Sequence, residues 1–377
     1  SYWDVVQRGF ALAFVYYGTV SLAVYLLTVR LLPRSPIPAP QVPIYDKILT
    51  GIFFAAVLYL IYLMGFAGTG DLLAAFYTAA AMFATLVIVF VGFKYVRKDA
   101  AVANETLFGC IRRAIETHAD MTSYLTLLLA TLGIMIGLFT VTGFIVRMGA
   151  ILTELGSWNI LAMIFMSFVF GWSAGTGLPP TATYIIGAVV IVPPMTKLGI
   201  NPWVAHCFVF LMSIWGELSP PTSLTAAVSS RIAGASFMRT MWEALKICLP
   251  ITLMTFAVFT RSNIVINPGW LQIADTILIF IGTCGIAFAM FGRFFENRRA
   301  DVAFRVLVAA LSLFVLFHPD DMLVWVPAAL VLAGVVVGVL RHRQIAPPAE
   351  TPQADEPTAL PPEDLEKLVV EARREVG

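Results

Sequence analysis

Two clusters of Gly, Pro, Ser and Thr interrupt long apolar runs of this chain. The first, WSAGTGLPPTATY, covers residues 172–184, and the second, WGELSPPTSLTAAVSS, covers residues 215–230. Gly and Pro break helices, and in a bilayer each backbone N–H or C=O left without a partner is costly. Such a break persists at membrane depth only where protein, a cavity or a bound ligand satisfies the freed groups. The two clusters therefore predict a binding site.

The chemistry available at the two breaks suits ions. Each break creates a half-helix N-terminus, whose positive dipole end favours an anionic substrate. Released backbone carbonyls and neighbouring hydroxyls are the ligands that a hard cation such as Na⁺ prefers. One Pro-Pro pair alone can mark a mere kink, but two hydroxyl-rich breaks close together in sequence favour a functional site. The hydroxyls are those of Ser173, Thr176, Thr181, Ser219, Thr222 and Ser223.

Ionisable side chains also fall within apolar segments. Glu217 immediately precedes LSPPTS, and a carboxylate inside the membrane is costly enough to indicate function. It either titrates as a proton-coupling group, or it faces a water-filled vestibule or pairs with a basic group. His206 lies in an apolar span without a facing histidine, which favours a hydrogen-bonded polar group over a metal or haem ligand. Asp275, near the start of a later span, is expected at the membrane interface.

The composition is that of an all-α polytopic membrane protein. Apolar residues make up 59% of the 377 positions and charged residues 12%, and the net charge of +1 gives no reason to expect a nucleic-acid partner. Four scattered cysteines without CxxC spacing indicate buried free thiols. HExxH and paired aspartates of protease type are missing from the sequence, and we predict no enzyme, no catalytic residues and no cofactor.

Spanning the hydrocarbon layer takes about 20 apolar residues. We expect spans at residues 8–31, 48–66, 72–95, 121–143, 239–260, 270–292, 303–318 and 321–340, with interrupted segments at 158–196 and 202–233. The charged stretch at 97–120 places Val102, Leu107, Ile111 and Ile115 near helical spacing, which predicts an amphipathic helix on the membrane surface. The Pro-rich acidic tail, 344–377, is predicted to be disordered.

Basic residues orient the chain, because cytoplasmic loops are enriched in Lys and Arg. Most of them fall on one side, which places the C-terminus in the cytoplasm; Arg147, Lys197 and Arg261 are the exceptions. This orientation requires residues 158–233 to cross the membrane a net odd number of times. One interrupted segment is then a re-entrant hairpin, and the other is a single span broken at its middle.

A family resemblance rests on these same residues. GTGLPPTATYIIGAVVIVPPMTKLGI and ELSPPTSLTAAVSSRIAGASFMRTMWEALKICLP resemble the second half of the large membrane domain of TRAP (tripartite ATP-independent periplasmic) transporters, specifically fused permeases of the TAXI type. The opening YWDVVQRGFALAFVYYGTVSLAVYLLTVR is similar to the helix that follows the first hairpin and first broken helix of that family. The resemblance covers roughly residues 1–265, and the later spans look like the C-terminal extension of many such permeases.

The resemblance implies a division of the chain. Residues 1–119 would supply scaffold-type helices and the surface helix. Residues 120–265 would form a transport-type region, with the second re-entrant hairpin at 158–196 and the second broken helix at 202–233. Residues 266–343 would be the transmembrane extension, followed by the cytoplasmic tail at 344–377. The fold would be half of an inverted-repeat, elevator-type transporter.

The resemblance also implies site residues. The hairpin tip would lie at residues 175–181 and the helix break at 219–223. Na⁺ would be held by backbone carbonyls near Gly175, Gly177, Gly216 and Ser219. Glu217 departs from the family pattern, which is small or apolar there. The substrate and ion contacts would come from Ser173, Gly175, Thr176, Gly177, Pro179, Pro180, Thr181, Thr183, Ser219, Pro220, Pro221, Thr222 and Ser223.

The implied function is secondary import of small organic acids across the bacterial inner membrane, driven by a Na⁺ gradient. The implied partners are a periplasmic solute-binding protein, membrane lipid, and the first repeat with a small four-helix membrane domain. The first repeat is not visible in this sequence, which opens without an initiator Met, so we expect a later part of a longer polypeptide or one of several chains. The alternatives are proton-coupled import through Glu217, a channel, and a structural membrane subunit that transports nothing.

Overall fold

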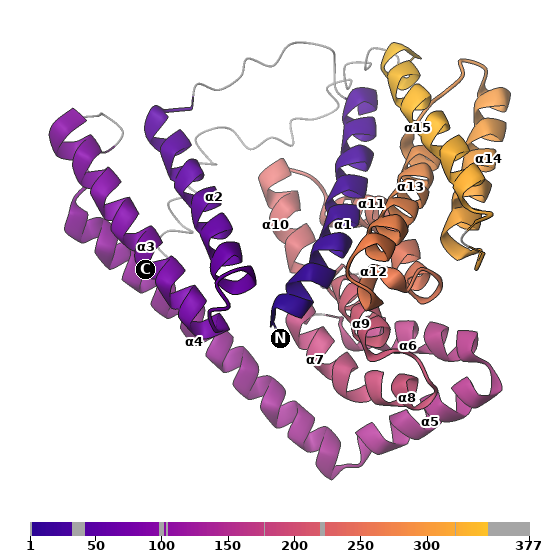
Figure 1. The fold of residues 1–377 in the computed structure, drawn as a ribbon, viewed down its shortest axis with the longest axis horizontal. Coiled ribbons are helices and arrows are strands. Elements are labelled where there is room, and N and C mark those ends of the chain that lie inside the picture. Colours follow the sequence, from indigo (N-terminus) through magenta and orange to yellow (C-terminus); the bar gives the residue numbers. More distant parts are fainter. Residues whose placement is uncertain are drawn as a thin grey trace. The chain divides into compact units, whose positions relative to one another are not determined.

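The computed structural model describes residues 2–31, 42–97, 102, 105–176, 178–218, 223–320 and 322–345. Within these ranges the regular structure is entirely helical (Figure 1), and seven helices are long and apolar enough to cross a membrane. The all-α polytopic fold is therefore confirmed. The predicted disordered tail lies outside the described residues, apart from positions 344 and 345 at the end of the last helix.

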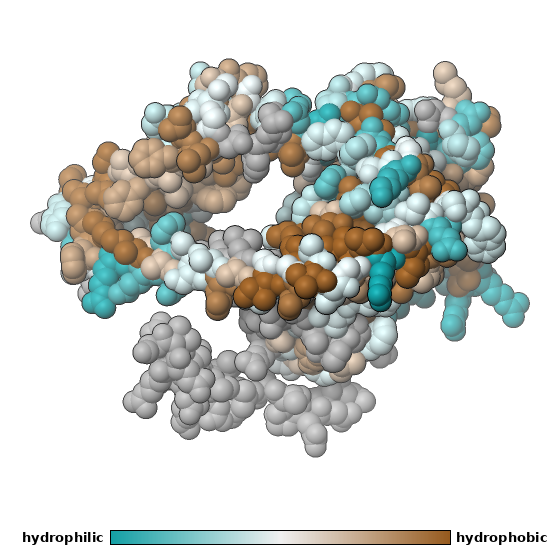
Figure 2. Space-filling view, turned by 90° about the horizontal axis from the view of Figure 1, so that it is seen from below, coloured by the Kyte–Doolittle hydropathy of each residue, from teal (hydrophilic) through white to brown (hydrophobic). Residues whose placement is uncertain are grey.

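One compact unit comprises residues 1–7 and 36–134. It contains α2 (Ile44–Gly65), α3 (Asp71–Val91) and the π-helical continuation η1 (Gly92–Arg97). Large apolar side chains stand exposed along α2 and α3 (Figure 2), among them Phe53, Leu58, Leu72 and Phe76. A soluble protein would bury such residues, and a bilayer leaves them facing lipid.

The predicted surface helix is not a separate element, which corrects the expectation of a break before residue 121. A single helix, α4 (Leu107–Val141), runs through this position. The sequence HADMTSY at 118–124 changes in polarity but contains neither Gly nor Pro to end a helix. The helix ends at Val141, shortly before Gly143, whose φ of +68° is a left-handed conformation that glycine adopts without strain. The next helix, α5 (Phe144–Trp158), was not predicted, and it leaves with a 72° bend.

A second compact unit comprises residues 8–35 and 135–377. It holds most of α1 (Tyr2–Leu31) and the helices after the bend. The later helices are α6 (Ile160–Ala174), α7 (Pro180–Val190), α8 (Val192–Lys197), α9 (Pro202–Glu217), α10 (Leu224–Ala233), α11 (Phe237–Thr260), α12 (Asn263–Ile266), α13 (Trp270–Phe291), α14 (Arg298–Phe317) and α15 (Trp325–Ile345). A buried apolar cluster joins α5–α9, and two others join α1 to α11, α13, α14 and α15.

Helix α13 lies at the centre of the C-terminal bundle. Its Thr283 hydroxyl shares a buried hydrogen bond of 2.8 Å with the Thr19 hydroxyl of α1. A Cβ on Gly285 would lie 2.1 Å from the Ser312 hydroxyl oxygen of α14 and 2.6 Å from a methyl carbon of Val331 of α15. Small residues let helices approach closely in a membrane, where the hydrophobic effect does not drive their association.

We expect Gly285→Ala to destabilise the protein by about 1–3 kcal/mol, because buried neighbours from two helices must move to admit the methyl group. Gly334→Ala in α15 is the matched control, since its added carbon would meet its nearest neighbour at an ordinary 3.4 Å. Thermal unfolding of the two variants in detergent measures the difference. Equal stability of the two variants would show that α13, α14 and α15 do not pack as described.

Three arginines cap the C-termini of helices in this unit. The Arg8 side chain donates to the Val265 carbonyl at 2.7 Å, and Arg305 donates to the Ala289 carbonyl at 2.6 Å. Arg261, only 1% exposed, donates to the Val315 carbonyl and to the His318 carbonyl at 2.6 Å. The last carbonyls of a helix lack intrahelical partners and carry the negative end of its dipole. The enrichment of Lys and Arg in cytoplasmic loops concerns charges in loops. Arg261 is buried and caps a helix, which explains why it does not follow that distribution.

Candidate functional site

The first break lies between α6 and α7. Helix α6 is capped by the Asn159 side chain, which accepts hydrogen bonds from the first-turn amides, and it ends at Ala174. A tight turn follows, in which the Leu178 amide donates to the Gly175 carbonyl at 3.0 Å. Pro179 precedes Pro180, the first residue of α7, where the missing N–H costs nothing. The break that the sequence predicts is present, although Gly177 lies outside the described residues.

The second break lies between α9 and α10. Helix α9 ends at Glu217, and α10 begins at Leu224. The Ser223 hydroxyl, on a residue 1% exposed, accepts from the Ala226 amide at 3.1 Å and so caps α10. Four predicted site residues between the two helices lie outside the described part of the chain, namely Ser219, Pro220, Pro221 and Thr222.

The two breaks meet through their backbones. A Cβ built on Gly216 would lie 2.7 Å from the Gly175 Cα and 3.1 Å from the Gly175 carbonyl oxygen. A Cβ built on Gly175 would lie 2.8 Å from the Gly216 Cα. Backbone atoms cannot rotate away as a flexible side chain does, so the absence of a side chain at both positions is a geometric requirement. The end of α6 and the end of α9 thus bring backbone groups of both breaks to one place.

Thr183 is the predicted hydroxyl that lies at this contact. It is 1% exposed, and its hydroxyl oxygen would be 2.9 Å from a Cβ on Gly175. The hydroxyl donates to the Pro179 carbonyl at 3.3 Å, which leaves its oxygen lone pairs able to accept from or coordinate a ligand. The Thr183 hydroxyl oxygen and the Gly175 carbonyl oxygen, which already accepts from the Leu178 amide, therefore lie near the contact between the two breaks.

The other hydroxyls of the first break lie differently. Ser173 and Thr176 are exposed and donate to carbonyls of α6, those of Phe170 and Trp172. Thr181 is also exposed. Among the described residues, none of these three hydroxyls is hydrogen-bonded to the second break.

Glu217 bridges the second break. Its carboxylate accepts a hydrogen bond from the Thr225 hydroxyl in the first turn of α10. Glu217 is half-buried. A carboxylate at the N-terminus of α10 interacts favourably with that helix's dipole. The structure shows a carboxylate hydrogen-bonded to a neutral hydroxyl, and both alternatives that the sequence left open stay predictions.

Some residues that support the site were not identified from the sequence. The Tyr184 hydroxyl of α7 lies 3.0 Å from His206 Nδ1 of α9, so His206 is a hydrogen-bonded polar group, as expected. A Cβ on Gly171 would be 2.0 Å from the Met212 methyl carbon, and one on Gly187 would be 2.5 Å from a Val209 methyl carbon. These glycines let α6 and α7 pack closely on α9. Their only sequence signal is a small residue on an otherwise apolar helix.

Asp275 is 4% exposed and lies in the first turns of α13, buried within the protein. Among the described residues, no three His, Cys, Asp or Glu side chains gather in a group that could hold a metal ion. The oxygens that the described residues place at the two breaks are backbone and hydroxyl oxygens, with the Glu217 carboxylate beside them.

The two breaks lie in a part of the chain that matches a known protein family. Residues 1–263 match the family model described as the DctM component of the tripartite ATP-independent periplasmic transporter. The matched region includes both breaks and ends at the start of α12, so α13–α15 lie beyond it. Neither the curated proteins nor the solved structures yield a match to the chain. The match covers well over half of the sequence, and the chain therefore belongs to the DctM family, the membrane permease component of tripartite ATP-independent periplasmic transporters.

Proposed function

We propose that this chain supplies the second-repeat half of a sodium and carboxylate site in a TAXI-type permease that imports small organic acids. The observation that supports this proposal is the backbone contact between Gly175 and Gly216, with Thr183 against it. Na⁺ is coordinated by neutral oxygens as well as by carboxylates, and freed carbonyls at broken helices are a recurrent way to provide them. The remaining ligands would come from residues around Gly177 and Ser219.

The anionic end of the substrate would approach the N-terminus of α7. Within the described part of the chain no side chain caps this helix, and Pro180 contributes no N–H, so the amides that follow it are open to an anion. The N-terminus of α10 is already occupied by the Ser223 hydroxyl. A carboxylate at α7 would then lie close to a cation at the glycine contact, and each ion would favour the binding of the other.

The same proposal includes the partners and the setting. A periplasmic solute-binding protein would deliver the substrate, and the first repeat and the small four-helix domain would come from an upstream segment or a separate chain. The permease would lie in the bacterial inner membrane with the C-terminus of this chain in the cytoplasm, as the Lys and Arg distribution favours. Movement of the hairpin-bearing region against a fixed scaffold would carry the site across the membrane.

Sodium-dependent stabilisation tests the site. We expect Na⁺ to raise the melting temperature of the complete permease relative to K⁺ at equal ionic strength, because a ligand at 100 times its dissociation constant adds about 2.7 kcal/mol of stability. The increase should disappear in Gly216→Ala. Equal melting temperatures in Na⁺ and K⁺, for a protein that carries out uptake, would overturn the sodium site.

Proton coupling through Glu217 is the second candidate, and its half-buried carboxylate at the break favours it. We expect Glu217→Gln to retain Na⁺-driven uptake within about fivefold of the original, because a neutral acceptor for Thr225 forfeits only about 1 kcal/mol relative to a charged one. Glu243→Gln, an exposed carboxylate on α11, is the control. The measurement is initial uptake as a function of pH. A Glu217→Gln variant whose uptake no longer depends on pH would establish the proton alternative instead.

A further inference from the structure

An apolar groove lies on the C-terminal bundle, between α1, α13 and α15. Its volume is about 370 Å³, within the range of about 300–1,000 Å³ typical of small-molecule sites. The side chains that line it are aliphatic or aromatic, apart from the thiol of Cys284. A wall without charged or hydroxyl groups suits a hydrocarbon chain. The lining includes Leu22 of α1, Phe280 of α13, and Leu332, Val336 and Val339 of α15.

The groove runs along helices that are each long and apolar enough to cross a membrane. Their candidate spans finish at the same end of the bundle (Figure 1), and these spans are Trp3–Arg30, Trp270–Phe291 and Trp325–His342. Leu332, Val339 and His342 are spaced by seven and then three residues, which places them on one face of α15. From Leu332 to His342 the helix rises about 15 Å, which is about half of the hydrocarbon layer. The length therefore corresponds to the acyl region of one leaflet.

The ends of α1 and α15 meet at the head of this groove. His342 is fully buried, and its Nε2 lies 3.0 Å from the Leu26 carbonyl oxygen. Leu26 lies one turn beyond Leu22, which lines the groove, and Arg30 lies one turn further along α1. Arg30 is exposed and ends the candidate span. The apolar wall is therefore followed, in the direction of the spans, by a cation.

Two more arginines lie at the same end. Arg341 precedes His342, and its guanidinium carbon lies 5.2 Å from the ring centroid of Phe294. Phe294 follows Arg293 in the loop between α13 and α14. Arg341 is exposed and Arg293 is half-buried. We call Arg30, Arg293 and Arg341 the head arginines, and each comes from a different segment of the bundle.

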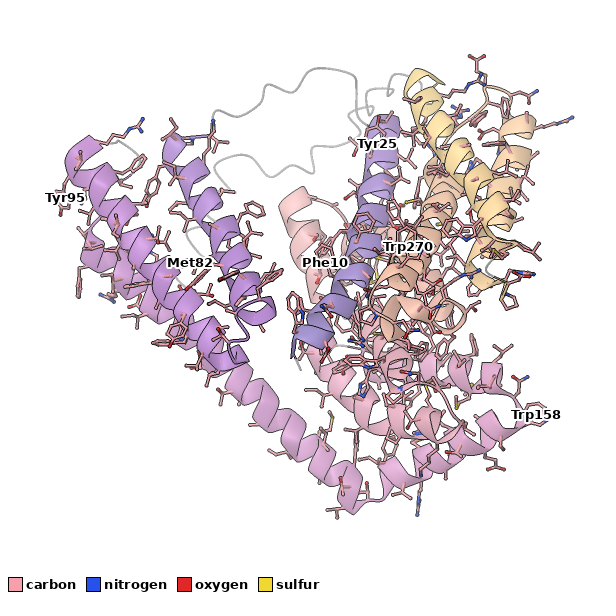
Figure 3. The ribbon with its side chains drawn as sticks, in the orientation of Figure 1. Phe10, Tyr25, Met82, Tyr95, Trp158 and Trp270 are labelled. Carbon is pink, nitrogen blue, oxygen red and sulfur yellow. The ribbon has the colours of Figure 1, made fainter. Side chains whose placement is uncertain are left out.

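Carboxylates do not neutralise the head arginines within the described residues, where no ion pair joins any of the three to Asp or Glu. The buried Asp301 carboxylate accepts from the Phe294 amide at 2.6 Å and lies 3.7 Å from Arg305. Glu296 is the exposed carboxylate of the same loop, which leaves a positive excess. Tyr25 of α1 is 41% exposed and lies toward this end (Figure 3), and exposed Tyr is typical of the headgroup level.

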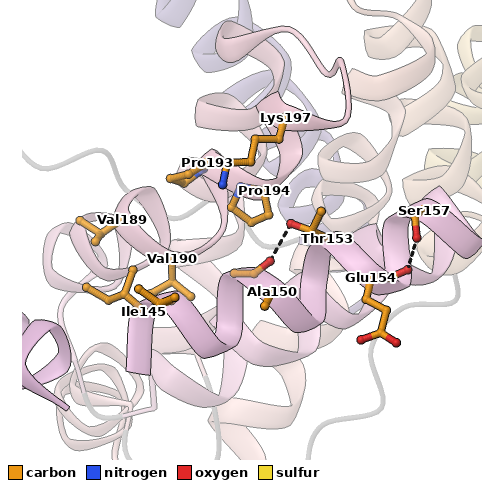
Figure 4. A pocket seen from close by; sticks show the side chains of 12 residues that line it. Ile145, Ala150, Thr153, Glu154, Ser157, Val189, Val190, Pro193, Pro194 and Lys197 are labelled. Carbon is orange, nitrogen blue, oxygen red and sulfur yellow. Dashed lines mark hydrogen bonds between the residues drawn. The ribbon is translucent and has the colours of Figure 1, made fainter. Parts of the chain in front are cut away.

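A larger groove, of about 620 Å³, lies between α5 and α7–α8 and lacks this arrangement (Figure 4). Lys197 lies at its rim, whereas the Glu154 carboxylate points away from it. Helix α5 also leaves the preceding helix with a 72° bend. Its side chains therefore do not select a ligand, in contrast to the head arginines, which are of one sign and follow an apolar wall.

We propose that the groove between α1, α13 and α15 binds an anionic phospholipid, with an acyl chain along its wall and the phosphate at the head arginines. Guanidinium groups form charge-assisted hydrogen bonds to phosphate oxygens. They would repel the ammonium of a zwitterionic headgroup, so a lipid without an amine is preferred. Because α13–α15 lie beyond the matched family region, this lipid would link the C-terminal extension to α1. The inference is independent of which substrate and ion the permease carries.

The test is lipid binding by the full chain in detergent, followed by native mass spectrometry. Phosphatidylglycerol, phosphatidylethanolamine and phosphatidylcholine with matched acyl chains would be supplied in equal amounts. We expect phosphatidylglycerol to bind about tenfold more tightly than the other two, since each basic residue near a lipid surface contributes about fivefold to the binding of anionic lipid. Arg30→Gln and Arg341→Gln should each lower that preference about fivefold, and Arg147→Gln, an exposed cation on α5, should retain it.

Two neighbouring variants of α15 test the groove itself. Val336 and Val337 are 51% and 45% exposed, so a larger side chain fits at either position without entering the core. Only Val336 lines the groove, so Val336→Trp should remove the selective adduct and Val337→Trp should keep it. Equal binding of the three lipids, or a preference that survives Val336→Trp, would overturn the proposal. Displacement of the adduct by glycerol 3-phosphate would also overturn it, because the arginines would then bind a free phosphate. Uptake is not measured, so these results are separate from those on the sodium site.

Discussion

Gly216→Ala is expected to abolish Na⁺-driven uptake, and Gly175→Ala is expected to do the same. The added methyl carbon would lie 2.7 Å from the Gly175 Cα in the first variant and 2.8 Å from the Gly216 Cα in the second. Real contacts of this kind do not occur, so the two half-helices must separate. Overpacking of this kind costs about 1–3 kcal/mol. If this cost applies to the Na⁺-bound state, it lowers the affinity for Na⁺ by about 5–150-fold.

Gly137→Ala in α4 is the matched control, because its added carbon would meet nothing within 4 Å. Initial uptake into proteoliposomes, normalised to the amount of inserted permease, is the measurement. A Gly216→Ala protein that inserts normally and retains wild-type uptake and Na⁺ dependence would remove the glycine contact from the mechanism.

Arg261→Met should cause the largest loss of stability among the cationic positions. The side chain is 1% exposed and is the link between the end of α11 and the end of α14, through the Val315 and His318 carbonyls. Methionine fills similar space but leaves both carbonyls without this donor. Each buried polar group that loses its partner costs about 1–3 kcal/mol, so we expect a loss of about 2–6 kcal/mol from the two carbonyls.

The stability of Arg261→Lys should fall between that of the wild-type protein and that of Arg261→Met, since an ammonium keeps the charge but loses the planar fork of donors. Arg299→Met is the control, because Arg299 is exposed at the start of α14. The midpoint of thermal unfolding, followed by circular dichroism in one detergent, ranks the variants. If Arg261→Met melts together with Arg299→Met, α14 is not held to α11 in the way described.

The two breaks were predictable because their signals are local. Gly and Pro disrupt helices wherever they occur, and the surrounding apolar runs show that the disruption falls within the membrane. The long span of α4 was not predictable in the same way. Hydropathy changes near residue 120, but the helical backbone continues to Val141 and turns at Gly143. Polarity alone indicates the environment of a residue and not the continuity of its helix.

Which hydroxyls face the candidate site could not be predicted from the sequence. Thr181 and Thr183 have the same chemistry in sequence, yet the structure exposes the first and buries the second against Gly175. Two positions along a helix differ by about 200° in direction, so only the packing of α7 decides which one faces the break. The contact between Gly175 and Gly216 likewise depends on how α6 rests on α9. The roles of Gly177, Ser219, Pro220, Pro221 and Thr222 stay predictions, since these residues lie outside the described part of the chain.

The bonding partners of Glu217 and His206 were missed for a related reason. Thr225 lies across the break from Glu217, and Tyr184 lies on a different helix from His206. Sequence reasoning identified the costly polar groups inside apolar segments, because burial without a partner is unfavourable. It did not identify the partners, because those depend on which helices become neighbours.

Uptake of labelled carboxylates is the measurement that tests the central claim most directly. The complete permease would be reconstituted in proteoliposomes with its solute-binding protein and supplied with an inward Na⁺ gradient or, separately, an inward proton gradient. We predict uptake that needs the binding protein, follows the Na⁺ gradient and is lost in Gly216→Ala but kept in Gly137→Ala. Uptake driven by the proton gradient alone, or no uptake under either gradient by an inserted permease with a loaded binding protein, would contradict a sodium site at the Gly175–Gly216 contact.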